Sequence, residues 1–178
     1  MNEKKDTLLK ALKTSLEMEE IGYKFYTQTV TKAKDLITKR TFRLLAKDEI
    51  NHREAIKKFY EESSLKESHP SAISLIKKHK SGRPKYIFLK PLTSLRKGAS
   101  VSRDQLEAYE FAMNLEKDGY NFYKRCLSNT KGVDAKRLFE FLIGQESEHF
   151  ALLQKTYNYL KNPEHWFLEE ERPIVEGG

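Results

Sequence analysis

Cysteine, proline and glycine are scarce in this chain of 178 residues. The single cysteine, Cys126, excludes an internal disulfide and any metal site built on pairs of cysteines. Only five prolines occur and none precedes Pro70, so the first third of the chain can form long helices. No apolar run reaches the length of a signal peptide or a membrane span. These absences predict a cytoplasmic protein that has no membrane partner.

Charged residues, in contrast, are abundant. They make up 33% of the chain, and the formal net charge is +7. Apolar residues nevertheless recur at helical spacing, which indicates a soluble helical protein rather than a disordered one. A positive excess is compatible with an anionic partner such as nucleic acid. A solvated, lysine-rich surface is the simpler interpretation, so we do not expect nucleic acid to be the partner.

One motif occurs twice, within a helical apolar pattern each time. Glu49-Ile50-Asn51-His52 recurs ninety-seven residues later as Glu146-Ser147-Glu148-His149. Because residues three apart share one face of a helix, each copy directs a carboxylate and an imidazole toward the interior. Burying such groups without partners costs on the order of several kcal/mol each. The motif therefore predicts a compensating partner, for which a metal ion is the obvious candidate.

The repeat extends to a second pair of glutamates. Glu19 lies thirty residues before Glu49, and Glu116 lies thirty residues before Glu146. The same pattern, Glu-x-x-Gly-x-x-Phe-Tyr, begins at each of these two earlier glutamates. Self-similarity at a fixed offset indicates repeated architecture, so we expect two helix pairs of one design. The tyrosines that end the two patterns are Tyr26 and Tyr123.

Four long helices are expected from these patterns. The first two cover about 6–33 and 35–63, the third covers about 102–128, and the fourth ends near Leu160. The helix pairs 6–63 and 102–160 would form one bundle domain over 1–161, followed by a tail over 162–178 that contains Trp166 and Phe167. Ser102 and Gln105 have the spacing of a capping box at the start of the third helix.

A long crossover over 65–103 joins the two pairs. Within it, Ser71 to His79 is expected to form a short helix after Pro70, and Tyr86 to Leu89 an extended segment docked on the bundle. A connection of this length fits passage along the bundle or an exchange of helix pairs between the two chains of a homodimer. The three histidines outside the repeated motifs are expected to be solvated, and Cys126 to be a small core residue. These histidines are His69, His79 and His165.

Together the four helices offer one glutamate from each of two helices and one Glu-x-x-His motif from each of the others. This is the ligand arrangement of di-iron and di-manganese four-helix bundles. Four carboxylates balance the charge of two divalent ions, and mixed oxygen and imidazole donors favour iron or manganese, with zinc or nickel also compatible. Tyr26 and Tyr123 are either core aromatics or phenols hydrogen-bonded to ligand carboxylates. The candidate metal ligands are Glu19, Glu49, His52, Glu116, Glu146 and His149.

The repeated pattern resembles the rubrerythrin-like branch of the ferritin-like superfamily over roughly 8–63 and 105–160. The resemblance implies an all-α ferritin-like four-helix bundle with a non-haem di-iron centre that reacts with hydrogen peroxide or dioxygen. Rubrerythrins proper also carry a rubredoxin domain with four iron-binding cysteines, which this chain lacks. Any electron donor must therefore be a separate protein. Their third helix supplies an extra carboxylate at the place occupied here by Gly119.

Three functions follow as hypotheses. The leading one is a di-iron oxidoreductase, active against oxidative stress, that reduces peroxide or dioxygen with electrons from an external donor protein. The second is a ferroxidase or iron-handling protein. The third is a non-enzymatic binding module, in which the basic segment 77–80 contacts nucleic acid or an acidic partner.

Overall fold

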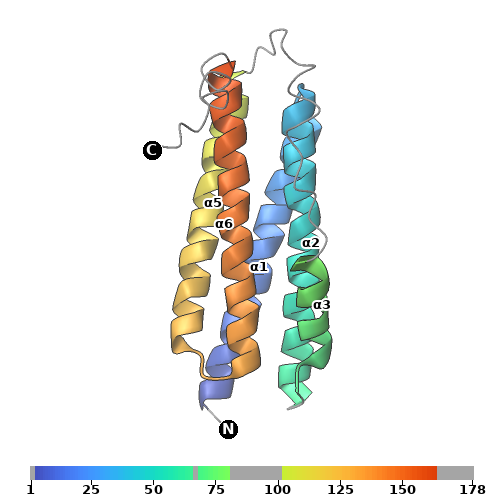
Figure 1. Ribbon diagram of the computed structural model, residues 1–178, viewed down its shortest axis with the longest axis vertical. Coiled ribbons are helices and arrows are strands. Elements are labelled where there is room, and N and C mark those ends of the chain that lie inside the picture. Colours follow the sequence, from blue (N-terminus) through green and yellow to red (C-terminus); the bar gives the residue numbers. More distant parts are fainter. Residues whose placement is uncertain (1–2, 66–67, 81–101, 164–178) are drawn as a thin grey trace, which may run out of the picture.

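Four long helices and one short helix make up most of what the computed structural model describes, which is residues 3–65, 68–80 and 102–163. The helices lie side by side along the long axis of the molecule (Figure 1). This arrangement confirms the predicted all-helical bundle, and the predicted bounds differ from the observed ones by at most three residues. The helices are α1 (Glu3–Lys32), α2 (Leu36–Leu65), α3 (Pro70–Lys80), α5 (Arg103–Asn129) and α6 (Val133–Lys161).

Helices that follow each other in the sequence pack against each other. α1 packs along α2, and α5 packs along α6, because only three residues separate the members of each pair. The two pairs meet through contacts between α2 and α6 and between α1 and α5. Each long helix therefore has two long neighbours, which encloses one interior. None of the described helices combines the length and apolar character that a membrane span needs.

The starts of α2 and α5 are tied together by side chains. Ser102 caps α5 as predicted, because its hydroxyl accepts the Gln105 N–H and Gln105 Oε1 accepts the Ser102 N–H. Asp35 Oδ1 accepts the Thr38 N–H at 2.7 Å in the first turn of α2. The other oxygen of Asp35 accepts a hydrogen bond from Gln105 Nε2, also at 2.7 Å. These bonds connect the two helix pairs at one end of the bundle.

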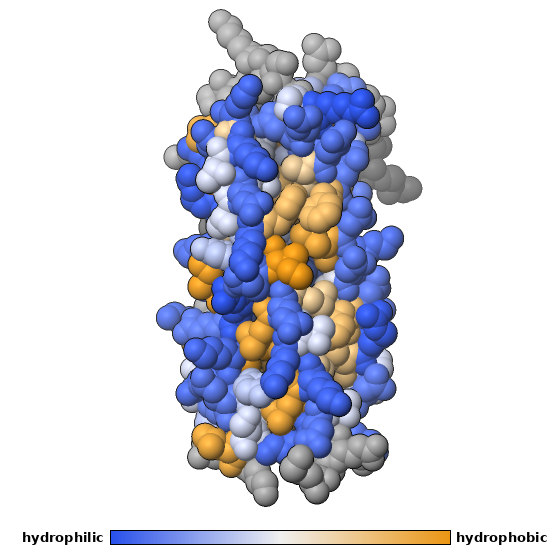
Figure 2. Space-filling model, turned by 180° about the vertical axis from the view of Figure 1, so that it is seen from behind, coloured by the Kyte–Doolittle hydropathy of each residue, from blue (hydrophilic) through white to orange (hydrophobic). Residues whose placement is uncertain are grey.

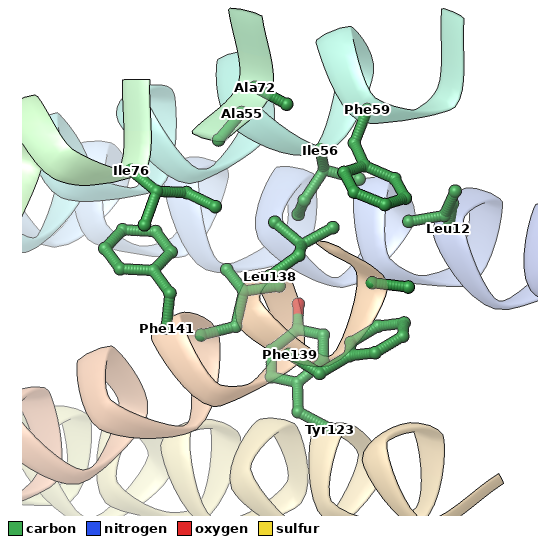
Figure 3. Packing of buried hydrophobic residues seen from close by; sticks show 12 residues of the cluster. Leu12, Ala55, Ile56, Phe59, Ala72, Ile76, Tyr123, Leu138, Phe139 and Phe141 are labelled. Atoms are coloured by element: carbon green, nitrogen blue, oxygen red, sulfur yellow. The ribbon is translucent and has the colours of Figure 1, made fainter. Parts of the chain in front are cut away.

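α3 forms where the sequence predicted a short helix. The Glu62 carboxylate of α2 accepts the N–H groups of Ser71 and Ala72 at 3.2 and 3.4 Å, which satisfies donors that the first helical turn leaves free. Ala72 and Ile76 are buried in the same apolar cluster as Phe141 of α6 (Figure 3). α3 is thus held against both α2 and α6.

His69 is not solvated as the sequence suggested. Its ring stacks on Phe59 with ring centroids 4.0 Å apart, and its Nε2 lies 2.9 Å from Ser63 Oγ. The hydrophobic ring contact and the hydroxyl partner, both supplied by α2, explain why this histidine is packed. The side chain of His79, His165, the segment Tyr86 to Leu89 and the tail from 164 onward lie outside the described residues.

The apolar core consists of two clusters separated along the bundle by a charged layer. On α1, Leu12 belongs to one cluster and Tyr26 to the other, and Glu19 lies midway between them. On α6, Phe139 and Leu153 bracket the second Glu-x-x-His motif in the same way. The apolar clusters therefore fix the helices above and below the layer in which the candidate ligands lie.

Candidate metal centre

Six buried ionisable side chains occupy the layer between the two apolar clusters. α1 and α5 supply one glutamate each, whereas α2 and α6 each supply a glutamate and a histidine from one Glu-x-x-His motif. None of the six is more than 5% exposed. The structure thus brings together all the side chains that the repeated motifs singled out, which are Glu19, Glu49, His52, Glu116, Glu146 and His149.

These side chains form two groups of three, and the ligand atoms within each group lie within 4.8 Å of one another. Each group draws on three of the four long helices, so a bound ion would link both helix pairs. Each group offers two carboxylates and one imidazole, a donor set that suits iron, manganese or zinc. The first group is Glu19, His52 and Glu146, and the second is Glu49, Glu116 and His149.

The Nδ1 atoms of both histidines face the carboxylates. His52 Nδ1 lies 2.9 Å from Glu19 Oε2 and 3.4 Å from Glu49 Oε2. His149 Nδ1 lies 3.4 Å from Glu116 Oε2 and 3.6 Å from Glu49 Oε1. The two imidazole rings stack with centroids 5.3 Å apart. Glu49 therefore lies beside both histidines.

The Nε2 atoms of the same histidines face two side chains that the sequence analysis missed. His149 Nε2 lies 3.4 Å from Asp48 Oδ2, and His52 Nε2 lies 3.4 Å from Gln145 Oε1. A proton on Nε2 can be donated to either oxygen, which leaves the lone pair of Nδ1 for a metal ion. A sequence signal did exist, because Asp48 and Gln145 each directly precede the glutamate of a Glu-x-x-His motif.

Two buried tyrosines support the carboxylates. The hydroxyl of Tyr26 in α1 donates to Glu116 in α5, and that of Tyr123 in α5 donates to Glu19 in α1. The sequence left two roles open for these tyrosines, and the hydrogen bonds to candidate ligand carboxylates favour the second. Each tyrosine reaches across the bundle, so the two hydrogen bonds join α1 to α5.

Burial and crowding raise the pKa of two of the carboxyls well above the usual range. For Glu49 the main cause is loss of solvation, with the negative charge of Glu19 second, and for Glu146 it is loss of solvation followed by the charge of Glu116. Burial would also raise the pKa of Glu19 and Glu116, but the neighbouring imidazoles and hydrogen-bond donors outweigh it and lower both values. Without a cation, the layer thus retains protons on some carboxyls.

The histidines retain protons for the same reason. Burial alone would lower the pKa of His149, but the charge of Glu116 and the hydrogen bond to Asp48 raise it to about 9. The pKa of His52 is also raised, because Glu19 outweighs the effect of burial. A cluster that binds extra protons in place of positive charge is one that divalent cations can neutralise.

Two buried atoms of the layer lack hydrogen-bond partners, and their positions show whether a metal ion fits there. Among the described residues, Glu116 Oε2 and His149 Nδ1 are buried without a hydrogen bond. Leaving such atoms unsatisfied costs about 1–3 kcal/mol each. Both belong to the same group of three and lie 3.4 Å apart. The residues present therefore fit a metal ion, which would accept both lone pairs at once.

Two glycines make room for the carboxylates. A Cβ atom on Gly119 would lie 2.9 Å from Glu146 Oε2, and one on Gly22 would lie 3.5 Å from Glu49 Cδ. Beside these glycines, α1 and α5 enclose a small cavity of about 170 Å³. The cavity is lined by Ile21 and Leu115 as well as by candidate ligands, and Ile21 is half exposed. Apolar side chains also gather along the middle of the face seen in Figure 2.

The helical bundle and its buried layer of carboxylates and imidazoles define a ferritin-like protein. A comparison with protein families matches residues 10–157 to rubrerythrin, and the chain belongs to the rubrerythrin family. Membership of this family implies binding of two iron ions. The chain is also similar in fold to a solved structure of a hypothetical protein from Pyrococcus furiosus. The TM-score is 0.63 with 21% identity, covering 87% of this chain and 90% of that one. A search of the curated proteins found no match.

Proposed function

We propose that this protein is a non-haem di-iron oxidoreductase that reduces hydrogen peroxide or dioxygen with electrons from an external donor. The observation that carries the proposal is the buried layer of four carboxylates and two imidazoles beside a small cavity. Without cations the layer is unfavourable, since two of its buried atoms have no hydrogen-bond partner. Family membership supports iron as the metal, and manganese or zinc suits the same donors.

Each group of three would hold one ion. Glu19, His52 and Glu146 form one position, and Glu49, Glu116 and His149 form the other. Bound there, two ferrous ions would supply the two electrons that the reduction of one hydrogen peroxide, with two protons, to two waters requires. The protein orients the ligands, because Tyr26 and Tyr123 hold one oxygen of Glu116 and of Glu19, respectively.

The cavity between α1 and α5 would give a small oxidant access to the ions. Its volume of about 170 Å³ accommodates a molecule the size of peroxide or dioxygen and is smaller than a typical metabolite pocket. Its lining includes Met18, Ile21 and Leu115 on the way to the carboxylates. We propose that a small oxidant reaches the centre through this cavity.

The electron donor and the assembly extend the same proposal. The 178 residues contain one cysteine, Cys126, which is too few for a rubredoxin-type iron site among them, and we propose that a separate redox protein returns electrons to the centre. We further propose that the helix pairs 6–63 and 102–160 are two copies of one unit joined by the crossover 65–103. A homodimer would be the functional form.

Rapid-mixing spectroscopy tests the redox function. The protein is loaded anaerobically with two equivalents of Fe²⁺ and mixed with hydrogen peroxide or with dissolved dioxygen. We expect absorption of ferric carboxylate species to rise within seconds, and repeated turnover when a reductase and a redox protein are added. Retention of all the iron as Fe²⁺ for minutes with either oxidant would contradict the proposal.

The same experiment separates a ferroxidase from an oxidoreductase. Asp118 is exposed and lines the cavity beside the layer, where its negative charge would attract ferrous ions. A ferroxidase would oxidise many equivalents of added Fe²⁺ with dioxygen and release or store the product. An oxidoreductase would stop after its two resident ions unless an electron donor is present.

A further inference from the structure

Asp48 and Gln145 occupy the same place in the two copies of the motif but differ in charge. Each directly precedes the glutamate of a Glu-x-x-His sequence, at the offset that relates the two halves of the chain. Asp48 of α2 reaches His149 of α6, whereas Gln145 of α6 reaches His52 of α2. The two contacts have the same atom on the histidine and the same length of 3.4 Å. One ring therefore faces a carboxylate oxygen where the other faces an amide oxygen.

The ligand positions themselves are matched. Glutamate corresponds to glutamate and histidine to histidine between the two groups of three. The supporting tyrosines also correspond, since Tyr26 and Tyr123 each bond one glutamate of the opposite helix pair. The candidate ligands and the two tyrosines are thus identical in the two halves of the chain, whereas Asp48 and Gln145 differ.

The charge of the side chain that accepts the Nε2–H of a histidine changes how strongly the imidazole binds a cation through Nδ1. A ring whose Nε2–H donates to a carboxylate is a stronger donor through Nδ1 than one whose Nε2–H donates to an amide. The carboxylate also attracts the cation directly through its charge. Replacing such an accepting side chain changes metal affinity by about 10–100-fold. The Asp48 side chain is 20% exposed, and solvent screening favours the lower end of that range.

We propose that the two metal positions are inequivalent, and that the group Glu49, Glu116 and His149 binds its cation about tenfold more tightly than the group Glu19, His52 and Glu146. Asp48 acts as the positioning residue that creates the difference. This inference rests on the metal centre of the proposed function but not on its redox reaction. The two ions therefore load in a fixed order.

Cobalt bound at one equivalent tests the order directly. Metal-free full-length protein is crystallised with one equivalent of Co²⁺, and anomalous scattering at the cobalt edge gives the occupancy of each position. At one equivalent, a tenfold difference in affinity gives occupancies that differ about threefold, so we expect cobalt beside His149 to exceed cobalt beside His52 by about threefold. Equal or reversed occupancy would overturn the inequivalence while leaving the metal centre intact. Absence of cobalt from both positions would overturn the centre and this inference together.

Exchanging the two residues tests the role of Asp48. The double variant Asp48→Gln with Gln145→Asp keeps the composition and the net charge, so only the place of the carboxylate changes. We expect the preferred cobalt position to move to the group that contains His52. A preference that stays beside His149 would overturn the assignment to Asp48.

Two single variants keep the test informative if the exchange prevents folding. Asp48→Asn preserves the shape of the side chain but removes its charge, and we expect the two occupancies to become equal. Glu140→Gln is the matched control, because Glu140 is an exposed carboxylate of α6. It should leave the preference for the position beside His149 unchanged, and a loss of preference there would show that general surface charge, not Asp48, sets the order.

Discussion

Gly119 lies closer to a candidate ligand than any ordinary side chain could. A Cβ atom at this position would come within 2.9 Å of Glu146 Oε2, a distance that real Cβ atoms do not adopt. The end of the Glu146 side chain can move away, but it would then leave the position at which it faces Glu19 and His52. At the residue scale, the absence of a side chain at 119 therefore protects the geometry of the metal layer rather than the stability of the helix.

Two matched substitutions test this interpretation. Gly119→Ala is expected to fold but to lower cobalt or iron binding at the group containing Glu146 by at least about tenfold, as disturbed ligand geometry does. Gly22→Ala is the control, because its Cβ would lie 3.5 Å from Glu49, an ordinary contact. It should retain both ions and stabilise the metal-free protein by about 0.5–1 kcal/mol, since alanine is the better helix former.

Calorimetric metal titration and thermal unfolding measure both effects. If Gly119→Ala binds two ions as tightly as the unmodified protein, Glu146 is not needed where we place it. A loss of metal of the same size in Gly22→Ala would contradict the special role of Gly119, because that substitution creates only an ordinary contact with Glu49.

The candidate ligands could be predicted from the sequence because their spacing along a single helix shows which of them share a face. Glu49 and His52 share a face because they are three residues apart, and the apolar pattern around them indicates that this face is buried. The hydrogen bond between Tyr26 and Glu116 and the contact between Asp48 and His149 could not be predicted in this way. Both contacts cross between helices, and their existence depends on the relative rotation of α1, α2, α5 and α6, which spacing along one helix does not determine.

At the scale of elements, α3 depends on one carboxylate of α2. Glu62 is buried and accepts two N–H groups from the first turn of α3. A negative charge at a helix start also interacts favourably with the helix dipole. The apolar contacts of Ala72 and Ile76 then hold the helix in its groove beside α2 and α6. The short helix therefore combines a cap from outside its own sequence with a small apolar face.

Removing that cap should loosen α3 without disturbing the metal layer. Glu62→Ala is expected to destabilise α3 by about 0.5–2 kcal/mol, the usual effect of losing a helix cap. Hydrogen exchange measured by mass spectrometry should then show faster exchange across 70–80 and unchanged exchange near Glu49. Glu61→Ala, at the exposed neighbouring position, should change neither. Equal protection of 70–80 in both variants would contradict the proposed cap.

The elements were more predictable than their packing. Pro70 and the polar residues around it indicated a helix start, and Ser102 with Gln105 indicated another, because capping chemistry is local. The contact between His69 and Phe59 was not foreseen, because a histidine near a helix end gives no signal of which neighbour it will meet. Residues 81–101 and 164–178 are not described, so the predicted extended segment and tail remain predictions.

At the scale of the whole molecule, a charged layer interrupts an apolar interior. The two apolar clusters lie on either side of it along every long helix. Without cations the layer retains protons, since the pKa values of Glu49, Glu146 and both histidines are raised. The stability of the metal-free protein should therefore depend on pH through these groups.

The sign of that dependence follows from His149. Despite burial, its pKa in the folded chain is raised to about 9, from 6.5 in an unfolded one, chiefly by Glu116. The folded state thus binds more protons, and stability falls as pH rises. The contribution is complete below pH 6.5 and lost as the pH rises through about 9. The raised pKa of Glu49 acts in the same direction.

We expect the Tm of the metal-free protein to fall between pH 6.5 and 9 in calorimetric scans. Metal affinity should rise over the same range, because each ion must displace protons from its ligands. Protein loaded with two ions should show a smaller change in Tm than metal-free protein. A Tm of the metal-free form that rises with pH through this window would contradict the charge distribution described here.

The central claim is that six side chains from two helix pairs hold two metal ions, and metal stoichiometry tests it most directly. The protein is loaded anaerobically with excess Fe²⁺, freed of unbound metal and analysed by mass spectrometry for iron per chain. The account predicts two ions per chain, and a loss of at least one ion in the double variant Glu49→Ala with His52→Ala. Two ions retained in that variant, or none in the unmodified protein, would contradict it.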